Sequence, residues 1–214
     1  MGVNASAPPG RVGLFGGAFD PPHDAHVALA RAAIEQLALD RLHIVPTGDA
    51  WHKSRSLSPA KDRLALCHLA FDALPQALVD DRELRRTGPT YTIDTLTELR
   101  ALYPHAELFL QIGADQAAAL HTWRRVNDIL QIATVSIASR ADCTSAEGQF
   151  DPNNPLPGVL ADAARVRVIN LPPMTHSATE VRRRVAAGLP VGELVPAPVA
   201  RYIAEHHLYQ SPAE

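Results

Sequence analysis

Residues 16–26 read G-G-A-F-D-P-P-H-D-A-H, and this stretch decides the fold of the chain. The four residues before it, V-G-L-F, form an apolar run typical of a buried strand. After it, apolar residues recur at the spacing of one helix face, at Val27, Ala30, Ile34 and Leu37. A strand therefore ends in a Gly-Gly turn, and a helix begins with His23 and His26 on one face. Because glycines let backbone N–H groups approach a phosphate and a helix N-terminus favours anions, the stretch predicts a site for nucleotide phosphates.

The rest of the chain continues the alternation of strand and helix. We expect further strands at 42–45, 77–79, 108–112, 132–137 and 166–169. We expect further helices at 60–74, 92–102, 177–187 and 199–206. This alternation predicts an α/β fold with a Rossmann-like parallel sheet and a small helical C-terminal part. Ligands of such sheets bind beyond the C-terminal ends of the strands, where the strand order switches.

Composition limits the class of protein. The chain has 214 residues, 46% of them hydrophobic, which suits a disordered tail at 1–10 followed by one domain at 11–214. A net charge of -3 gives no support to nucleic-acid binding, which needs a basic face. No apolar run approaches the roughly 20 residues that span a bilayer, so we expect no membrane association. Cys67 and Cys143 require no disulfide, and the default expectation is a cytoplasmic location.

The two histidines of the first motif have more than one interpretation. They could be a surface residue and a helix cap, or they could share a zinc ion, but only Asp20 and Asp24 lie nearby as further ligands. The adjacent glycine turn favours phosphate binding, and we expect no metal site built by the protein itself. Imidazoles at this place can donate to phosphate oxygens and stabilise charge on a leaving pyrophosphate.

A second motif, S-A-T-E-V-R at 177–182, begins the helix expected there. Ser177 and Glu180 have the spacing of a capping box, which by itself would explain a well-started helix. A capped helix start that also carries Thr179 and Arg182 is an anion site, where Arg182 would hold ATP phosphates as a forked donor. The two arginines that follow it are expected to face solvent.

Together the two motifs resemble those of the HxGH nucleotidyltransferase superfamily, G-G-x-F-D-P-x-H-x-G-H and I-S-x-T-x-I-R. The chain departs from this pattern at Ala25, where the family usually has glycine, and at His176, where it usually has isoleucine, and Val181 is a conservative replacement for the second isoleucine. Either motif alone is a weak signal. Both in this order, at opposite ends of an α/β pattern, are specific.

Three middle segments resemble the branch of this superfamily that adenylylates nicotinate mononucleotide, the bacterial nicotinate-nucleotide adenylyltransferases. They are the E-L-R-R…T-Y-T…T-L stretch at 83–96, the I-G-A-D run at 112–115 with Trp123 after it, and the loop in which Pro46 is followed by His52 and Lys53.

The resemblance implies adenylyl transfer from ATP to nicotinate mononucleotide, giving deamido-NAD and pyrophosphate in NAD biosynthesis, with Mg²⁺ accompanying ATP. It implies the catalytic residues His23, His26, Lys53 and Arg182. It implies ATP-binding residues at Gly16, Gly17, Phe19, Gly113, Asp115, Ser177, Thr179 and Arg182. It implies acceptor-binding residues at Ala18, His52, Thr92, Trp123 and Arg124.

The chemistry of these residues agrees with such roles. Trp123 offers a π face on which a pyridine ring can stack, although a half-buried core tryptophan is the other interpretation. Thr92 begins an expected helix, so its N–H could bind the nicotinate carboxylate, and Arg124 could add charge or face solvent. Asp115 suits a ribose hydroxyl or a helix cap. Lys53 lies in a polar loop and could close over phosphates.

Other functions stay open at this level. The acceptor could be the amide form, nicotinamide mononucleotide. The chain could also be a nucleotide-binding sensor that keeps the fold without catalysis, although both motifs retain their histidines and arginine. The sequence does not determine the oligomeric state, and a homodimer is one option.

Overall fold

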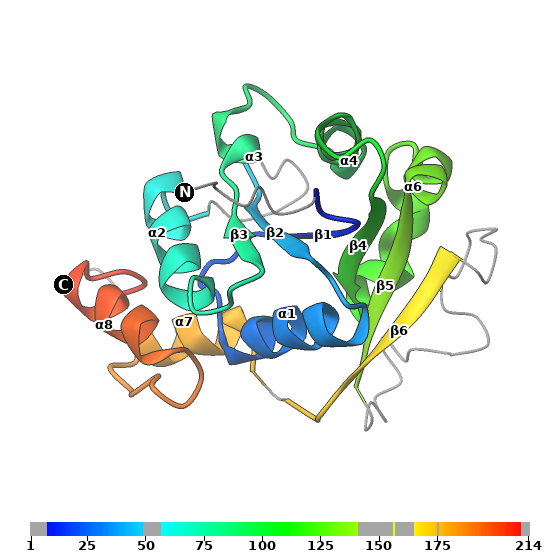
Figure 1. Ribbon diagram of the computed structural model, residues 1–214. Coiled ribbons are helices and arrows are strands. Elements are labelled where there is room, and N and C mark those ends of the chain that lie inside the picture. Colours follow the sequence, from blue (N-terminus) through cyan, green and yellow to red (C-terminus); the bar gives the residue numbers. More distant parts are fainter. Residues whose placement is uncertain (1–7, 49–56, 141–155, 157–164, 175, 211–214) are drawn as a thin grey trace, which may run out of the picture.

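The computed structural model describes residues 8–48, 57–140, 156, 165–174 and 176–210, which form a three-layer α/β fold (Figure 1). Within this part of the chain, six parallel strands make one sheet in the order β3-β2-β1-β4-β5-β6. The strands are β1 (Arg11–Gly17), β2 (Arg41–Pro46), β3 (Ala77–Val79), β4 (Glu107–Gly113), β5 (Ala133–Arg140) and β6 (Val166–Leu171). The predicted α/β class with a Rossmann-like parallel sheet is confirmed.

Helices cover both faces of the sheet. Those on one face are α1 (Asp24–Gln36), α2 (Ala60–Phe71), α7 (Ala178–Ala186) and α8 (Ala197–Glu205). Those on the other face are α4 (Thr92–Leu102), α5 (Ala114–Ala119) and α6 (Val126–Ile132). Two further helices are very short: α3 (Arg82–Arg85) and the 3₁₀ helix η1 (Leu120–Thr122). The last helix, α8, packs beside α2, far from it in sequence (Figure 1).

The central strands are buried on both faces. In β4, Leu108 and Leu110 belong to the core cluster that contains residues of α4 and α6, whereas Phe109 between them belongs to the cluster that contains residues of α1 and α2. Successive side chains of a strand point to opposite faces, so a strand covered by helices on both sides reads as a continuous apolar run. This is why the L-F-L sequence of β4 predicts a buried parallel strand.

The strand order switches between β1 and β4. From β1 the chain passes through α1 to β2, and from β4 it passes through α5 and α6 to β5 on the opposite face. The connections after β1 and β4 therefore diverge and leave a crevice at the C-terminal ends of the two strands. Gly17 ends β1 and Gly113 ends β4, so both glycine turns lie at this crevice.

Three short α-helices were not expected from the sequence. α3 lies in a charged segment that has the composition of a turn, and α5 and α6 have only six and seven residues. Helices of this length show too few turns for an apolar period to be recognised. As a consequence Ile132, expected at the start of a strand, ends α6 instead. Of the expected tail, residues 1–7 lie outside the described part, and β1 begins at Arg11.

A buried polar network ties the end of β3 to β2. Nδ1 of His43 lies 2.7 Å from Oδ2 of Asp80, and Nε of Arg82 donates to the same oxygen at 2.8 Å. Nε2 of His43 lies 3.1 Å from the hydroxyl of Tyr103. Burial acts to raise the pKa of Asp80, but the hydrogen bonds from His43 and Arg82 outweigh it and hold this pKa below its usual range. Asp80 is therefore an ionised carboxylate that joins two strands and α3.

Asp80→Asn is expected to lower the free energy of unfolding at pH 7 by about 3 kcal/mol, because Arg82 and His43 lose their carboxylate partner. A carboxyl whose folded pKa is depressed stabilises the fold above its unfolded pKa and stops doing so as the pH falls through the folded pKa. The difference from wild type should therefore shrink below about pH 4. Urea unfolding of wild type and Asp80→Asn at pH 7 and pH 3 measures this difference in stability, and Asp72→Asn, at an exposed carboxylate, is the control. A loss of stability in Asp80→Asn that is equal at both pH values would contradict the depressed pKa of Asp80.

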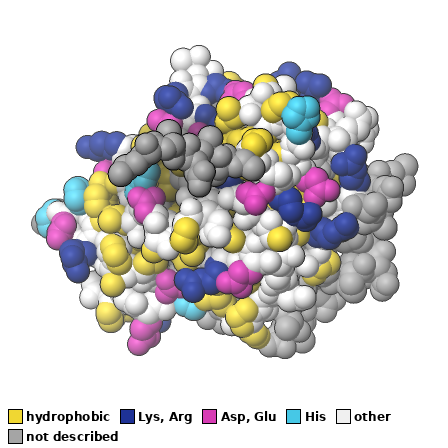
Figure 2. All heavy atoms as spheres, in the orientation of Figure 1, with side chains coloured by type: hydrophobic (Ala, Val, Ile, Leu, Met, Phe, Trp, Pro, Cys, Tyr) yellow, Lys and Arg dark blue, Asp and Glu magenta, His cyan; other side chains and the backbone are white. Residues whose placement is uncertain are grey.

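The surface carries charges of both signs. On the face shown in Figure 2, Lys and Arg side chains are interspersed with Asp and Glu rather than gathered in one area. Among the described helices, none combines the length and the apolar composition needed to cross a membrane.

Candidate active site

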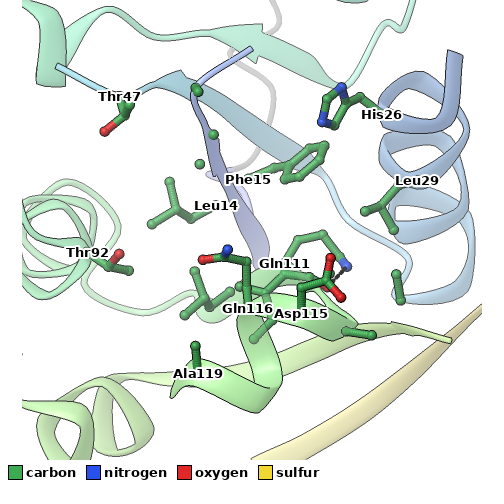
Figure 3. Close-up of a pocket in the computed structure, with 18 of the residues that line it drawn as sticks. Leu14, Phe15, His26, Leu29, Thr47, Thr92, Gln111, Asp115, Gln116 and Ala119 are labelled. Carbon is green, nitrogen blue, oxygen red and sulfur yellow. Dashed lines mark hydrogen bonds between the residues drawn. The ribbon is translucent and has the colours of Figure 1, made fainter. Parts of the chain in front are cut away.

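A pocket of about 820 Å³ lies in the crevice at the ends of β1 and β4. His26 projects from α1 on one side and Thr92 marks the start of α4 on the other, with Asp115 and Gln116 of α5 between them (Figure 3). Many predicted site residues line the pocket together: Gly16, Gly17, Ala18, His23, His26, Thr92, Gly113, Asp115, Trp123, Arg124 and Ser177. The fold thus gathers residues from opposite ends of the chain, from Gly16 to Ser177.

The two histidines form one stacked unit at the start of α1. Their ring centroids are 3.7 Å apart with 25° between the planes. The backbone N–H of His23 donates to Nδ1 of His26 at 3.2 Å. Because Nδ1 of His26 accepts this bond, a neutral His26 ring carries its proton on Nε2. Nε2 of His26 is then a hydrogen-bond donor, which is the form a phosphate oxygen requires.

The first turn of α1 offers fewer backbone donors than the sequence suggests. The N–H of Asp24 donates to the carbonyl of Leu194 at 3.0 Å, so the C-terminal part of the chain already uses it. The sequence predicts that the N–H groups at the start of α1 are available to an anion, and for the N–H of Asp24 this prediction is wrong. The side chains of His23 and His26, rather than this N–H, face the pocket.

Phe19 does not line the pocket, although the family pattern predicts an ATP-binding role for it. Its ring is buried, lies edge-on to His26 at 5.2 Å between centroids, and packs on Phe15 and Phe71. A Cβ added to Gly17 would come within 3.1 Å of this ring. Phe19 thus supports His26 from behind, and glycine at position 17 leaves room for the Phe19 ring.

Gly113 differs from Gly17 in what surrounds it. A Cβ added to Gly113 would meet no protein atom within 4 Å, and Gly113 lines the pocket. The space beside it is therefore pocket volume. Its φ of -81° is open to any residue, so the backbone does not require glycine here. Asp115 lies in the first turn of α5, next to this opening, and is not the residue that caps the helix.

Aromatic and cationic side chains line the opposite side of the pocket. Thr92 is the first residue of α4, as predicted. The guanidinium of Arg124 lies over the ring of Tyr91, 4.6 Å from its centroid. Trp123 is half-buried against the core between the sheet and α4, and it also lines the pocket; its stacking on a pyridine ring stays a prediction.

The second motif begins α7 with half of the expected capping box. Oγ of Ser177 accepts from the N–H of Glu180 at 3.2 Å. The carboxylate of Glu180 instead accepts from Arg183 at 2.7 Å and from Arg184 at 3.0 Å. These hydrogen bonds, that from Arg183 first, lower the pKa of Glu180 to about 2. Arg183 is exposed, as expected, and both arginines also bind the carboxylate of Glu180.

Arg182 reaches the first motif but does not line the pocket. Its Nη1 donates to the backbone carbonyl of Asp20 at 2.7 Å, and its Nη2 donates to Oγ1 of Thr179 at 3.2 Å. Thr179 likewise does not line the pocket. The two motifs are thus joined directly through Arg182, a contact that their sequences do not reveal.

Two of the predicted site residues lie outside the part of the chain that the structure describes, and the sequence did not predict every residue that lines the pocket. His52 and Lys53 lie outside the described residues. Gln111 lines the pocket although no motif marks it; it is buried, and its Oε1 accepts from Ser136 at 2.7 Å. The one signal for it was a polar residue inside the apolar run of β4. Across the described part of the chain, no group of three or more His, Cys, Asp and Glu side chains could hold a metal ion.

The glycine turn, the paired histidines and the switch-point pocket agree with the nucleotidyltransferase class that the two motifs resemble, and the comparisons with known proteins show this class. A family model described as cytidylyltransferase-like matches residues 14–184, which is most of the chain. The solved structure of the Plasmodium falciparum nicotinic acid mononucleotide adenylyltransferase complexed with NaAD has a similar fold, with a TM-score of 0.73. That likeness is at 17% sequence identity and covers 93% of this chain and 97% of the other.

Sequence relatives narrow the class. A protein of Albidiferax ferrireducens named "Probable nicotinate-nucleotide adenylyltransferase" is 53% identical over 201 residues, covering 94% of this chain and 98% of its own. A protein of the same name from Methylibium petroleiphilum is 39% identical, covering 98% of this chain and 97% of its own. The chain belongs to the nicotinate-nucleotide adenylyltransferase family within the cytidylyltransferase-like proteins.

Proposed function

We infer that the protein transfers the adenylyl group of ATP to nicotinate mononucleotide, giving deamido-NAD and pyrophosphate, a step in NAD biosynthesis. One observation carries this inference beyond the family name. The pocket has a side suited to phosphates, with His23 and His26, and a side suited to an aromatic acid, with Thr92, Trp123 and Arg124. A dinucleotide product has the same two-part chemistry.

The reaction needs no covalent enzyme intermediate. An oxygen of the mononucleotide 5′-phosphate forms a bond to the α-phosphorus of ATP. The bond from that phosphorus to the bridging oxygen of the β-phosphate breaks, and its electron pair leaves with pyrophosphate. Such transfers depend on positioning the two phosphates and on stabilising the charge that develops on the leaving group.

On the ATP side, His26 would stabilise the developing charge through its Nε2–H, with His23 stacked beside it. The glycine turns at Gly16 and Gly113 would admit the nucleotide close to the backbone. Arg182 would add positive charge next to the first motif. The role predicted for Lys53 belongs to the same proposal and rests on the family pattern.

On the acceptor side, Trp123 would stack on the pyridine ring. The N-terminus of α4 at Thr92 and the guanidinium of Arg124 would face the nicotinate carboxylate. These groups favour an anionic ring substituent over a neutral amide. The proposal therefore includes a preference for the acid form of the mononucleotide.

Mg²⁺ enters this proposal with ATP. The described residues supply no cage of carboxylates for it, and Mg²⁺ ordinarily keeps several waters and binds substrate phosphates. When bound, it would neutralise charge on the departing pyrophosphate.

The function is tested by pyrophosphate release with ATP and Mg²⁺, with nicotinate mononucleotide, nicotinamide mononucleotide and phosphopantetheine offered separately. Release with the first acceptor well above the other two is the expected result. Equal or faster release with the amide form would overturn the assignment of Thr92 and Arg124. ATP binding without release for any acceptor would instead indicate a nucleotide sensor.

Gly113→Ala is expected to raise the KM for ATP about ten-fold, or about 1.4 kcal/mol, because the added methyl group occupies pocket space. Its melting temperature should equal that of wild type, since no protein atom opposes the methyl group. Gly17→Ala is the matched control, because its methyl group meets the buried Phe19 ring and should cost about 1–3 kcal/mol of stability. Steady-state kinetics with thermal unfolding separates the two effects; a destabilised Gly113→Ala with normal KM would contradict the proposal.

A further inference from the structure

The turn that leads from β1 into the histidine pair holds an unfavourable backbone conformation. Phe19 has a φ of 45°, in the left-handed region that bulky residues rarely adopt. Such a conformation is energetically unfavourable and persists only where the surrounding structure enforces it. The residues that enforce it therefore decide where His23 and His26 are held.

Three side chains from distant parts of the sequence bind this turn. Nη1 of Arg63, on α2, donates to the carbonyl of Ala18 at 3.0 Å. Nη1 of Arg182, on α7, donates to the carbonyl of Asp20 at 2.7 Å. The hydroxyl of Tyr209, after α8, donates to Oδ1 of Asp20 at 2.7 Å, across 189 positions of sequence.

Asp20 is the centre of these contacts. Its side chain is buried, with a relative exposure of 1% for the residue, and its Oδ2 accepts from the backbone N–H of Ser58 at 3.2 Å. One residue thus joins the first motif, the start of α2, Arg182 and the C-terminal segment. A buried carboxylate is stable only when its hydrogen bonds are made, so removal of one donor also weakens the hydrogen bonds that remain.

We propose that Tyr209 is a positioning residue for adenylyl transfer. Its hydroxyl holds the Asp20 carboxylate, and Asp20 in turn keeps the Phe19 turn, the histidine pair and Arg182 in one arrangement for ATP. This proposal rests on the proposed function of the pocket. Burial, followed by the charge of Asp20, raises the pKa of Tyr209, so the hydroxyl stays a donor at all pH values where the enzyme would be assayed.

The chain offers a matched control for this hydroxyl. Tyr202, on α8, donates to Oδ1 of Asp62 at 3.0 Å. Asp62 is also a buried carboxylate, but it lies on α2, and its side chain accepts from Tyr202 rather than from a group that binds the Phe19 turn. Tyr202→Phe and Tyr209→Phe each delete one hydroxyl that serves a buried carboxylate in the C-terminal packing.

The test compares Tyr209→Phe, Tyr202→Phe and wild type by steady-state kinetics and by calorimetric titration with ATP. Tyr209→Phe should lower kcat about ten-fold and weaken ATP binding about five-fold, with the KM for nicotinate mononucleotide within about two-fold of wild type. Tyr202→Phe should match wild type in all three quantities. If Tyr209→Phe behaves like Tyr202→Phe in kcat and ATP affinity, the hydroxyl is only structural and the proposal is wrong.

A double-variant cycle tests the route through Arg182. In an Arg182→Lys background, Tyr209→Phe should weaken ATP binding by less than about two-fold, since the arrangement it protects is already lost. If the effects of Arg182→Lys and Tyr209→Phe on ATP affinity are fully additive, Tyr209 does not act through Arg182 and this part of the proposal is wrong. ATP titration needs no turnover, so it decides the positioning role even if wild type transfers to no acceptor, which would instead refute the proposed function.

Discussion

His26→Ala is expected to lower kcat by about 10²–10³-fold, while the KM for nicotinate mononucleotide stays within about two-fold of wild type. The reason lies in the tautomer of the ring. Nδ1 of His26 accepts the N–H of His23, so the proton on Nε2 is the group that can meet charge on the leaving pyrophosphate. An interaction that strengthens only as that charge develops lowers the barrier without changing acceptor binding.

Two further variants make the result specific. His26→Gln can place an amide N–H near the position of Nε2, so it should recover part of the lost kcat. His68→Ala removes an exposed histidine of α2 that pairs with Asp72 and does not line the pocket, so it should leave the kinetics unchanged. Because His26 packs against Phe19, thermal unfolding must show that His26→Ala is folded. A folded His26→Ala with normal kcat, or one whose loss lies entirely in KM, would refute the catalytic assignment.

Trp123→Ala is expected to raise the KM for nicotinate mononucleotide about 10- to 100-fold, with kcat and the KM for ATP within about two-fold of wild type. Stacking of an aromatic ring on tryptophan contributes about 1–3 kcal/mol, and it is present in ground and transition states alike. Trp123 is half-buried and lines the same pocket as Arg124 and His26.

Trp123→Phe is the matched variant for this experiment. It keeps a π face at the same position and should raise the KM by much less than alanine does. Since Trp123 also packs against the core, both variants should lose some stability. Initial-rate kinetics with each substrate varied in turn measures the effect. An unchanged KM for the mononucleotide in a folded Trp123→Ala protein would exclude stacking.

Much of the site could be predicted because its signals are local. The glycine turn, the spacing of His23 and His26, and the start of α4 at Thr92 each depend on a few neighbouring residues. Turn chemistry and helical period are encoded over such short distances. The alternation of apolar runs with helical patterns also predicts a parallel α/β sheet, because parallel strands require crossover connections.

Other features depended on contacts between segments far apart in the chain. The burial of Phe19 behind His26, the bond from Arg182 to the Asp20 carbonyl and the use of the Asp24 N–H by Leu194 have no local signature. In the sequence, Gln111 is only a polar residue within an apolar strand; its place in the pocket lining follows from the pairing of β4 with β1.

By itself, then, the sequence determined the class of fold, the family and the residue types of the two motifs, since these follow from local periodicity and turn chemistry. Only the tertiary structure decided which of those residues face the pocket and which brace it. The strand order sets β1 next to β4, and the C-terminal segment folds back to bring Tyr209 to Asp20. Such contacts arise from the packing of whole elements, whose relative positions no short stretch of sequence encodes.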